Sequence, residues 1–400
     1  MTARPESCLP SVKRIQTCWY VANMGKNSVV SVMGFGFVVI LALAGCTSPT
    51  AAPSAAPVTP SASPPTELSS APASRFDMAC DDLVTPAELD ALFGPNEYQP
   101  RTSWTPSVSP VTYAVQSIGG LSCTWGNDDV PLGGVANPAY DELTVQVLPD
   151  ATAAQIDRHT GDHPLDDAPT IGDTSGTTCF AQSGLCTSNI VVGQAWIDVF
   201  LQGANAADAA SDAAVRALAL PILNAVTARV AAASNTTAPV AAVTARTDCE
   251  AILPAATVQS VFHAEELPVH SQYGSGGWSV MTGAATLAGV ARCSVGPAGS
   301  DVTLANLELL PNAAWAFDTD HVASGVWEKH EAVTVAGVSE QAYLLCPVGT
   351  VSACSVDFVV DGDWVRLGTS INGQRPVEDG DRDQVLELAG HVASALTSLR

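Results

Sequence analysis

The stretch that decides the fold occurs twice, first as Ile190-Val191-Val192-Gly193-Gln194-Ala195-Trp196 and, 168 residues later, as Phe358-Val359-Val360-Asp361-Gly362-Asp363-Trp364. Each copy has an apolar run, a short polar break and a tryptophan. Gly-containing breaks between such runs favour two-residue β-hairpin turns, and Asp-Gly is the strongest of these signals. We therefore predict hairpins over residues 190–199 and 358–367, with both tryptophans in the core.

The cysteines outside these hairpins repeat in the same way. Four of them precede four others by 167 to 170 residues, and the pairs are Cys80 and Cys249, Cys123 and Cys293, Cys179 and Cys346, and Cys186 and Cys354. A constant spacing with a drift of a few residues indicates a duplicated unit with loop insertions. The sequence predicts two homologous domains, residues 76–233 and 246–400, and a linker at 234–245.

Local patterns indicate the class of each domain. Thr85-Pro86-Ala87-Glu88 is typical of a helix start, with a capping Thr, a Pro at the first position and a Glu that closes the capping box. Leu143–Val147 alternates apolar and polar residues, as a strand with one buried face does. Helical spacing of apolar residues predicts closing helices, which Pro221 should start or kink in the first domain. The spaced residues are Val215, Leu218, Ile222 and Val226, then Val385, Leu388, Val392 and Leu396.

These patterns together predict an α+β fold. Each of the two homologous domains should be an antiparallel sheet covered by N- and C-terminal helices and held by two disulfides.

The N-terminal residues form an export signal. An apolar run over residues 29–43 leads to Leu43-Ala44-Gly45-Cys46, which resembles the lipobox of bacterial lipoproteins, where the Cys is acylated. We expect a signal peptide at 1–45, with translation starting at Met24, and a lipid on Cys46. The alternative is a single membrane-spanning helix, for which the 18 residues from 28 to 45 are short. Residues 46–75 are rich in Ser, Pro, Ala and Thr, as an extended tether is.

The charge balance narrows the choice of partners. The chain has 40 acidic and 16 basic residues, a net charge of −24. Nucleic acids bind proteins through clustered Lys and Arg, so a nucleic acid is not expected. We expect a cell-membrane protein that a lipid anchors on the extracytoplasmic side. Wall glycan, a small ligand or another envelope protein are its candidate partners.

The eight domain cysteines predict disulfides, because exported proteins use even numbers of cysteines in this way. Each domain allows three pairings. Short loops close at the least entropic cost, which favours pairing in sequence order. That order joins Cys80 with Cys123, Cys179 with Cys186, Cys249 with Cys293 and Cys346 with Cys354. Structural zinc is the alternative, and it would require cysteines two to four residues apart.

Catalytic motifs are missing from the sequence. It contains no Gly-x-Ser-x-Gly, His-Glu-x-x-His, Walker loop or dinucleotide-binding glycine pattern. His159 and His163 lie among aspartates, but Gly161 and Pro164 disfavour the helix that would bring them together. The segment 379–383 resembles half a calcium loop, and we interpret it as an acidic helix start. We predict no catalytic residue, no metal and no cofactor.

Aromatic residues in loops are the candidate ligand-binding residues. Tyr98, Trp104 and Tyr113 lie between the first helix and first strand of one domain, and Tyr273 and Trp278 lie in the other. Loop aromatics can stack on sugars or bind peptides. The alternative is that they pack over the sheet as ordinary cover. We choose Tyr98, Trp104, Tyr273 and Trp278 as the binding candidates.

The start of each domain also resembles a known family. Cys80-Asp81-Asp82-Leu83-Val84-Thr85, with Glu88 and later Cys123-Thr124-Trp125, is similar to an actinobacterial lipoprotein family of unknown function. The second copy keeps the opening Cys249-Glu250-Ala251-Ile252-Leu253 but has Cys293-Ser294-Val295 in place of the tryptophan pattern. More loosely, the unit resembles extracellular sensor domains of receptor kinases. The resemblance implies an envelope location and disulfides, and it assigns no catalytic residue.

Two functions follow from the sequence. The first is a non-enzymatic, sensor-like module that binds a ligand or partner through its aromatic loops or through the seam between the domains. The second is a wall-modifying hydrolase that uses a carboxylate pair, which leaves no sequence motif. The repeated features are apolar residues, cysteines and turns, so we favour binding.

Overall fold

The computed structural model describes residues 70–95, 98–101, 109–127, 140–151, 156, 171–181, 183–203, 211–233, 248–271, 279–299, 303–318, 330–339, 342–346, 353–369 and 377–399. All of its helices and strands lie in one compact unit, Pro65–Arg400. The predicted signal peptide and almost all of the tether lie outside the described residues.

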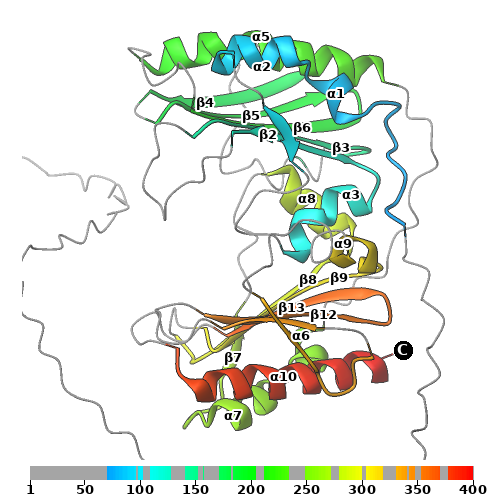
Figure 1. Cartoon of the computed structure of the whole chain (residues 1–400), viewed down its shortest axis with the longest axis vertical. Coiled ribbons are helices and arrows are strands. Elements are labelled where there is room, and N and C mark those ends of the chain that lie inside the picture. Colours follow the sequence, from blue (N-terminus) through cyan, green and yellow to red (C-terminus); the bar gives the residue numbers. More distant parts are fainter. Residues whose placement is uncertain are drawn as a thin grey trace, which may run out of the picture. The chain divides into compact units, whose positions relative to one another are not determined.

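The first half of this unit forms an antiparallel sheet, here called sheet 1, with the strand order β1-β2-β3-β6-β5-β4. Its strands are β1 (Gln99–Arg101), β2 (Leu121–Gly126), β3 (Glu142–Leu148), β4 (Thr174–Phe180), β5 (Leu185–Val192) and β6 (Ala195–Gln202). Three helices cover one face of it (Figure 1). They are α1 (Cys80–Leu83), α2 (Pro86–Phe93) and α5 (Asp212–Ala232).

The second half forms sheet 2, also antiparallel, with the strand order β10-β11-β12-β13-β9-β8-β7. Its strands are β7 (Val269–Ser271), β8 (Ala291–Gly296), β9 (Ala305–Leu310), β10 (Glu331–Val333), β11 (Ala342–Leu345), β12 (Cys354–Val360) and β13 (Asp363–Thr369). The covering helices are α6 (Cys249–Ile252), α7 (Ala255–Phe262) and α10 (Asp379–Ser398). The predicted α+β class, with a helix-covered antiparallel sheet in each half, is confirmed.

Disulfides join the cysteines in sequence order. Cys80 bonds to Cys123 and Cys249 to Cys293, so in each half the first helix is tied to the second strand from one edge of the sheet. Cys179 bonds to Cys186 and Cys346 to Cys354 across short loops. The pairing that loop entropy favoured is therefore the pairing in the structure.

Both predicted hairpins are present, as β5–β6 and β12–β13. Asp361 and Gly362 turn the second hairpin with φ of 52° and 88°, which is the left-handed backbone that an Asp-Gly turn supplies. Trp196 and Trp364 are fully buried. Their indole N–H groups donate to Asn189 at 2.8 Å and to Asp357 at 2.9 Å.

The closing helix of the first half differs from its predicted pattern. Ser211 caps α5 and the helix begins at Asp212, so Pro221 lies inside it and does not start it. Leu218 is 47% exposed, and Ala219 occupies the buried face instead. Ala219 belongs to the core cluster of the first half. The prediction that Leu218 lies on the buried face of the helix was therefore wrong by one position. In α10 all four predicted residues are buried.

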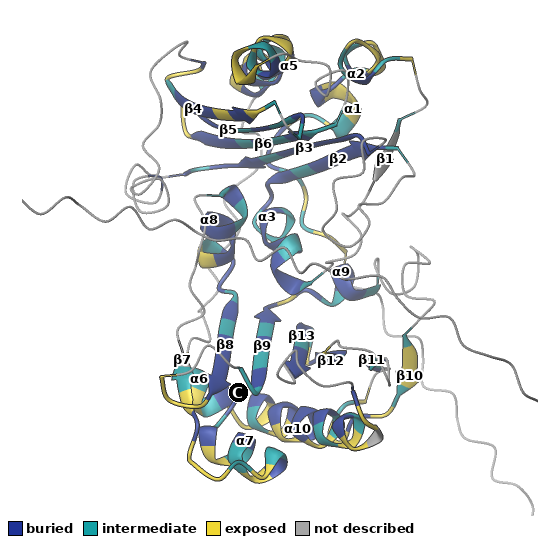
Figure 2. Cartoon of the chain, turned by 90° about the vertical axis from the view of Figure 1, so that its left-hand side faces the viewer, coloured by how far each residue is buried: buried dark blue, intermediate teal, exposed yellow. Residues whose placement is uncertain are grey.

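The two halves share a third apolar cluster beside their own cores. It is built where short helices of each half contact the sheet of the other: η1 (Pro110–Tyr113) contacts β9 and β13, and α8 (Val280–Leu287) contacts β3 and β6. Tyr113 of the first half lies with its ring centroid 5.7 Å from Trp315 and 5.6 Å from Trp364 of the second. Figures 1 and 2 show α8 and α3 (Ala114–Ser117) between the two sheets. Much of the inner face of each sheet is therefore covered by the opposite half.

Candidate ligand pocket

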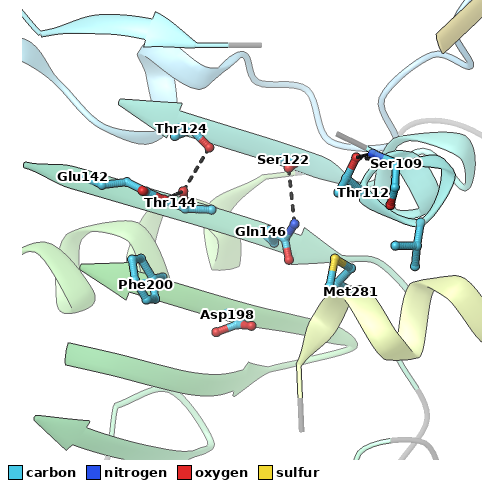
Figure 3. Close-up of a pocket in the computed structure, with 11 residues that line it drawn as sticks. Ser109, Thr112, Ser122, Thr124, Glu142, Thr144, Gln146, Asp198, Phe200 and Met281 are labelled. Carbon is cyan, nitrogen blue, oxygen red and sulfur yellow. Dashed lines mark hydrogen bonds between the residues drawn. The ribbon is translucent and has the colours of Figure 1, made fainter. Parts of the chain in front are cut away.

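A pocket of about 460 Å³ lies on the inner face of sheet 1, which is the face opposite α5. Strands β2, β3 and β6 form its floor, and η1 and α8 form its walls (Figure 3). The second half contributes Met281, so both halves build the site. The lining residues are Ser109, Val111, Thr112, Ser122, Thr124, Glu142, Thr144, Gln146, Asp198, Phe200 and Met281.

Strand alternation explains this lining. On β3 the residues Leu143, Val145 and Val147 enter the core of the first half, so the residues between them face the other way. Those residues are Glu142, Thr144 and Gln146, and all three line the pocket. Sheet 1 therefore has an apolar face under α5 and a largely polar face in the pocket.

Hydrogen bonds hold most of the polar lining in place. The hydroxyls of Thr124 and Thr144 lie 2.9 Å apart, and Gln146 donates to Ser122 at 3.4 Å. Glu142 is buried and accepts hydrogen bonds from the hydroxyls of Tyr140 and, at 2.7 Å, Thr144. The pocket thus presents hydroxyl and amide groups whose positions are fixed by their neighbours.

Asp198 is the unusual member of the lining. It lines the pocket with its side chain partly accessible to solvent, and desolvation raises its pKa from 3.8 to about 7. A backbone hydrogen bond from the N–H of Val280, in the first turn of α8, acts in the opposite direction. No side chain of the described residues donates a hydrogen bond to Asp198 or forms an ion pair with it. Among the described residues, only the backbone N–H of Val280 therefore compensates its charge.

The register places Asp198 in a row of four side chains that crosses sheet 1. Ser122 pairs with Gln146, Gln146 with Asp198, and Asp198 with Asn189. We call these four residues the polar row of sheet 1. It contains one charged side chain, Asp198.

The same four positions of sheet 2 hold alternating charges. Arg292 pairs with Glu308, Glu308 with Arg366, and Arg366 with Asp357. We call these residues the polar row of sheet 2. Arg366 donates to Asp357 through two nitrogens at 2.9 to 3.0 Å, and Arg292 lies 3.5 Å from Glu308. In the second copy of the duplicated unit, arginines thus supply the cations of the polar row. In the first copy, the position equivalent to Arg366 holds Asp198.

Two of the sequence-predicted aromatic residues, Tyr98 and Tyr113, are described, and neither lines the pocket. Tyr98 is half-buried, its ring 5.0 Å from that of Phe93, and its hydroxyl donates to the carbonyl of Phe93 at 3.3 Å and to Asp141 at 3.2 Å. It does not belong to the lining of the pocket. Tyr113, which was grouped with the loop aromatics, is buried in the shared cluster. Trp104, Tyr273 and Trp278 lie outside the described residues, as do Cys46, His159 and His163.

Sequence reasoning missed the residues that line the pocket. The available signal was the polar side of each strand, including Thr144 and Gln146 on β3 and Asp198 on β6. Polar alternation normally marks a solvent-facing side, and here α8 packs on that side and η1 forms a wall of the pocket. Helix α8 lies about 80 residues further along the chain than β6, so alternation alone did not indicate a pocket.

The described part of the chain bears on two other kinds of site, a metal site and a membrane-spanning helix. It contains no group of three or more His, Cys, Asp or Glu residues placed to hold a metal ion. One helix there, α5, is long and apolar enough to cross a membrane. Since α5 packs on β4 and β5 and the covering helix of a folded domain has the same composition, this is weak evidence for a span.

Comparison of the chain with protein-family models, with curated proteins and with solved structures finds no match.

Proposed function

We propose that the protein is a ligand-binding module of the cell envelope, tethered outside the membrane by a lipid on Cys46, and that the pocket on sheet 1 is its binding site. The pocket is the observation that carries this proposal. Its volume of about 460 Å³ falls within the usual range for small-molecule sites, about 300 to 1,000 Å³. Apolar walls with a few fixed polar groups are also typical of such sites.

The comparison between the two halves supports a binding role for this pocket. Ion pairs occupy the polar row of sheet 2, so the charges of that row are paired with one another. The polar row of sheet 1 faces a pocket instead. The two rows differ in chemistry because, in this proposal, the row of sheet 2 stabilises the fold and the row of sheet 1 binds a ligand.

The hydrolase alternative fits the pocket less well. Its two carboxylates are Glu142 and Asp198, and Asp198 pairs with Gln146, four residues from Glu142 along β3. At ~3.3 Å per residue the backbone positions are ~13 Å apart along the strand. Glycosidase carboxyl groups lie about 5 to 9.5 Å apart. In addition, Tyr140 and Thr144 already hydrogen-bond to Glu142, so the pair has no geometry of a general acid facing a nucleophile.

A pocket-filling substitution tests the binding role. We expect Thr144→Trp to abolish saturable binding of small molecules from an envelope extract, as followed by native mass spectrometry of the purified full chain. Asn224→Trp is the matched control, because it adds the same side chain on the exposed face of α5. Ligands that bind Thr144→Trp as well as the parent chain would show that the site lies elsewhere. Release of shortened wall glycan by the parent chain would instead support the hydrolase.

The lipid anchor has a separate test. We expect the mature chain to begin at a diacylated Cys46 and to enter the detergent phase, and Cys46→Ala to stay in the aqueous phase. Mass spectrometry of the native N-terminus decides this point, and a mature chain that begins at another residue would contradict it.

A further inference from the structure

The chemistry of the pocket is set by Asp198, a carboxylate that no described side chain neutralises. Asp198 interacts with the N–H of Val280 and with no described side chain that carries a charge or a donor. Burying a carboxylate without a partner is costly, and proteins normally pair such a group. A ligand that brings a positive charge would supply the missing partner.

The polar row of sheet 2 shows what that partner looks like when the chain provides it. There the guanidinium of Arg366 forms a two-nitrogen hydrogen bond with Asp357, on the neighbouring strand. Arg292 adds a second cation to the same row. In sheet 1 the corresponding positions are Asp198, Asn189 and Ser122, and no Lys or Arg is among the described residues that line the pocket. In the polar row of sheet 2, arginines pair with the acidic side chains. The polar row of sheet 1 has an acidic side chain and no cation.

We propose that the pocket binds an organic cation, a protonated amine with an apolar body, and that Asp198 is its counter-charge. This inference rests on the proposed function, since it names the ligand class of the same pocket.

The remaining lining fits such a ligand. Val111, Phe200 and Met281 give apolar walls from η1, β6 and α8. Thr124, Thr144 and Gln146 present acceptor oxygens along the floor, and an ammonium group has only donors to offer. The aromatic face of Phe200 can also attract a cation. An anion, by contrast, would meet carboxylates and no basic side chain among the described lining residues.

The pH dependence of binding follows from the groups around Asp198. Glu142 on β3 is the other titratable residue of the lining, and the residues that η1, α8 and β5 place nearby are uncharged: Ser109, Thr112, Met281 and Asn189. An amine pairs with the ionised carboxylate, so its binding should strengthen as the pH rises through the pKa of Asp198, about 7.

The experiment compares amines with neutral molecules of the same shape. The probes are 2-phenylethylamine with 2-phenylethanol, and cyclohexylamine with cyclohexanol, titrated into the purified full chain by calorimetry. We expect each amine to bind at least tenfold more tightly than its alcohol at about pH 8. We also expect the amines to lose at least tenfold in affinity between about pH 8 and pH 5.5.

A charge-removing variant connects the effect to Asp198. Asp198→Asn keeps an oxygen that can accept from the N–H of Val280, and it should lose at least tenfold in amine affinity and its pH dependence. Asp173→Asn is the matched control, because Asp173 is exposed, accepts from the N–H of Gly193 at 2.6 Å and lies outside the pocket. Near-ultraviolet circular dichroism of the buried tryptophans shows whether each variant is folded.

Three results would overturn the inference: equal binding of amines and alcohols, amine binding unaffected by Asp198→Asn, or no amine binding at all. If alcohols bind and Thr144→Trp blocks them, the pocket remains the binding site and the charge assignment fails. If Thr144→Trp changes the binding of no molecule that the parent chain binds, the proposed function fails as well.

Discussion

Trp196 and Trp364 occupy equivalent positions, and a single change beside each one alters the chemistry of its sheet. The indole of Trp196 donates to the amide oxygen of Asn189, and the indole of Trp364 donates to the carboxylate of Asp357. A carboxylate can accept several hydrogen bonds, so Asp357 also holds Arg366. Asn189 carries no charge, and the residue opposite it is Asp198. The polar rows of the two sheets therefore differ in charge at both of these positions.

The sequence predicted some of these residues and not others, for a physical reason. Burial of both tryptophans follows from the hairpin pattern, which depends on neighbours within a few residues. The pocket around Asp198 depends on α8, whose residues are about 80 positions away along the chain. A side chain whose environment comes from such a distant segment has no local signal.

Gly283 lets α8 lie against sheet 1. A Cβ at this position would stand 2.8 Å from Cζ3 of Trp196 and 3.4 Å from Leu148. The tryptophan is fully buried, so we expect Gly283→Ala to lower the free energy of unfolding by about 1 to 2 kcal/mol. The loss is reduced by the better helix propensity of alanine, about 1 kcal/mol.

Gly380→Ala is the control for this prediction. Gly380 also lies in a helix, α10, and its added Cβ would have no neighbour within 4 Å. Chemical denaturation of the two variants should show Gly380→Ala equal to or more stable than the parent chain. A Gly283→Ala variant that matches it would mean that α8 is not held against Trp196.

Asp198 should also make the stability of the fold depend on pH. Its pKa is raised from 3.8 to about 7, so the folded chain binds a proton that the unfolded chain has released between these values. Stability is therefore lost as the pH rises from about 4 to 7, and the loss persists above 7. Asp198→Asn removes this penalty.

We expect Asp198→Asn to raise the free energy of unfolding at pH 8 by about 1 to 4 kcal/mol, where the upper value is the full pKa shift. At pH 3 the variant and the parent chain should be equally stable. Urea denaturation across this pH range measures the difference. A gain that is the same at pH 3 and pH 8 would assign the effect to packing and not to charge.

At the scale of elements, the closing helix shows where periodicity is insufficient. A stripe of apolar residues spaced by three or four positions can be drawn through Leu218 or through Ala219 in α5. The structure buries Ala219 and leaves Leu218 at 47% exposure. The choice between two such stripes depends on the shape of the opposing surface, which the helix sequence does not contain. The helix itself and its capping serine are local features.

Helices α2 and α5 are connected by an ion pair that should be measurable. Arg229 of α5 donates to both carboxylate oxygens of Glu88 at 2.8 Å and to the carbonyl of Leu83 at 2.8 Å. Burial alone would raise the pKa of Glu88, but the hydrogen bonds from Arg229 and Thr85 outweigh it and lower the pKa to about 2. The pair therefore stabilises the fold fully above about pH 4.5, and its contribution is lost as the pH falls towards 2.

We expect Glu88→Gln to lower the free energy of unfolding by about 1 to 2 kcal/mol at pH 7 and by almost nothing at pH 2. This value is reduced because both side chains are partly exposed. Glu331→Gln is the control, since Glu331 forms a similar pair with Arg382 at the exposed surface, where solvent screens it. Thermal unfolding at both pH values separates the two. Equal losses for both variants would show that burial of the Glu88 pair adds nothing.

At the scale of the whole described unit, each half contributes a short helix to the inner face of the other. Residue order predicted the two sheets, their helices and the disulfides, because each of these is completed within one copy. The mutual covering by η1 and α8 was not predicted, since it requires the two copies to face each other. The shared cluster that results has consequences for how the halves fold.

Separated halves should fold but remain incomplete. Each has its own core and two disulfides, so we expect chains 76–233 and 246–400 to form their sheets alone. Alone, however, the first exposes Leu148 and Trp196, and the second exposes Trp364, since the cluster that buries them includes residues of both halves. Burial of each large apolar side chain contributes about 1.5 to 3 kcal/mol, so both fragments should be less stable than the full unit.

Mixing the two fragments tests this coupling directly. We expect them to associate with a dissociation constant in the micromolar range or tighter, because several such side chains are buried together and their gain must exceed the entropic cost of association. Analytical ultracentrifugation measures the complex, and tryptophan fluorescence should shift to shorter wavelength as Trp196 and Trp364 leave water. Gly283→Ala in the second fragment should weaken association, and Gly380→Ala should leave it unchanged, because only the former places a methyl group against Trp196. The opposite result would be fragments that do not associate and that unfold at the same temperatures as in the intact chain. It would show that the halves are independent and that the shared cluster contributes nothing to stability.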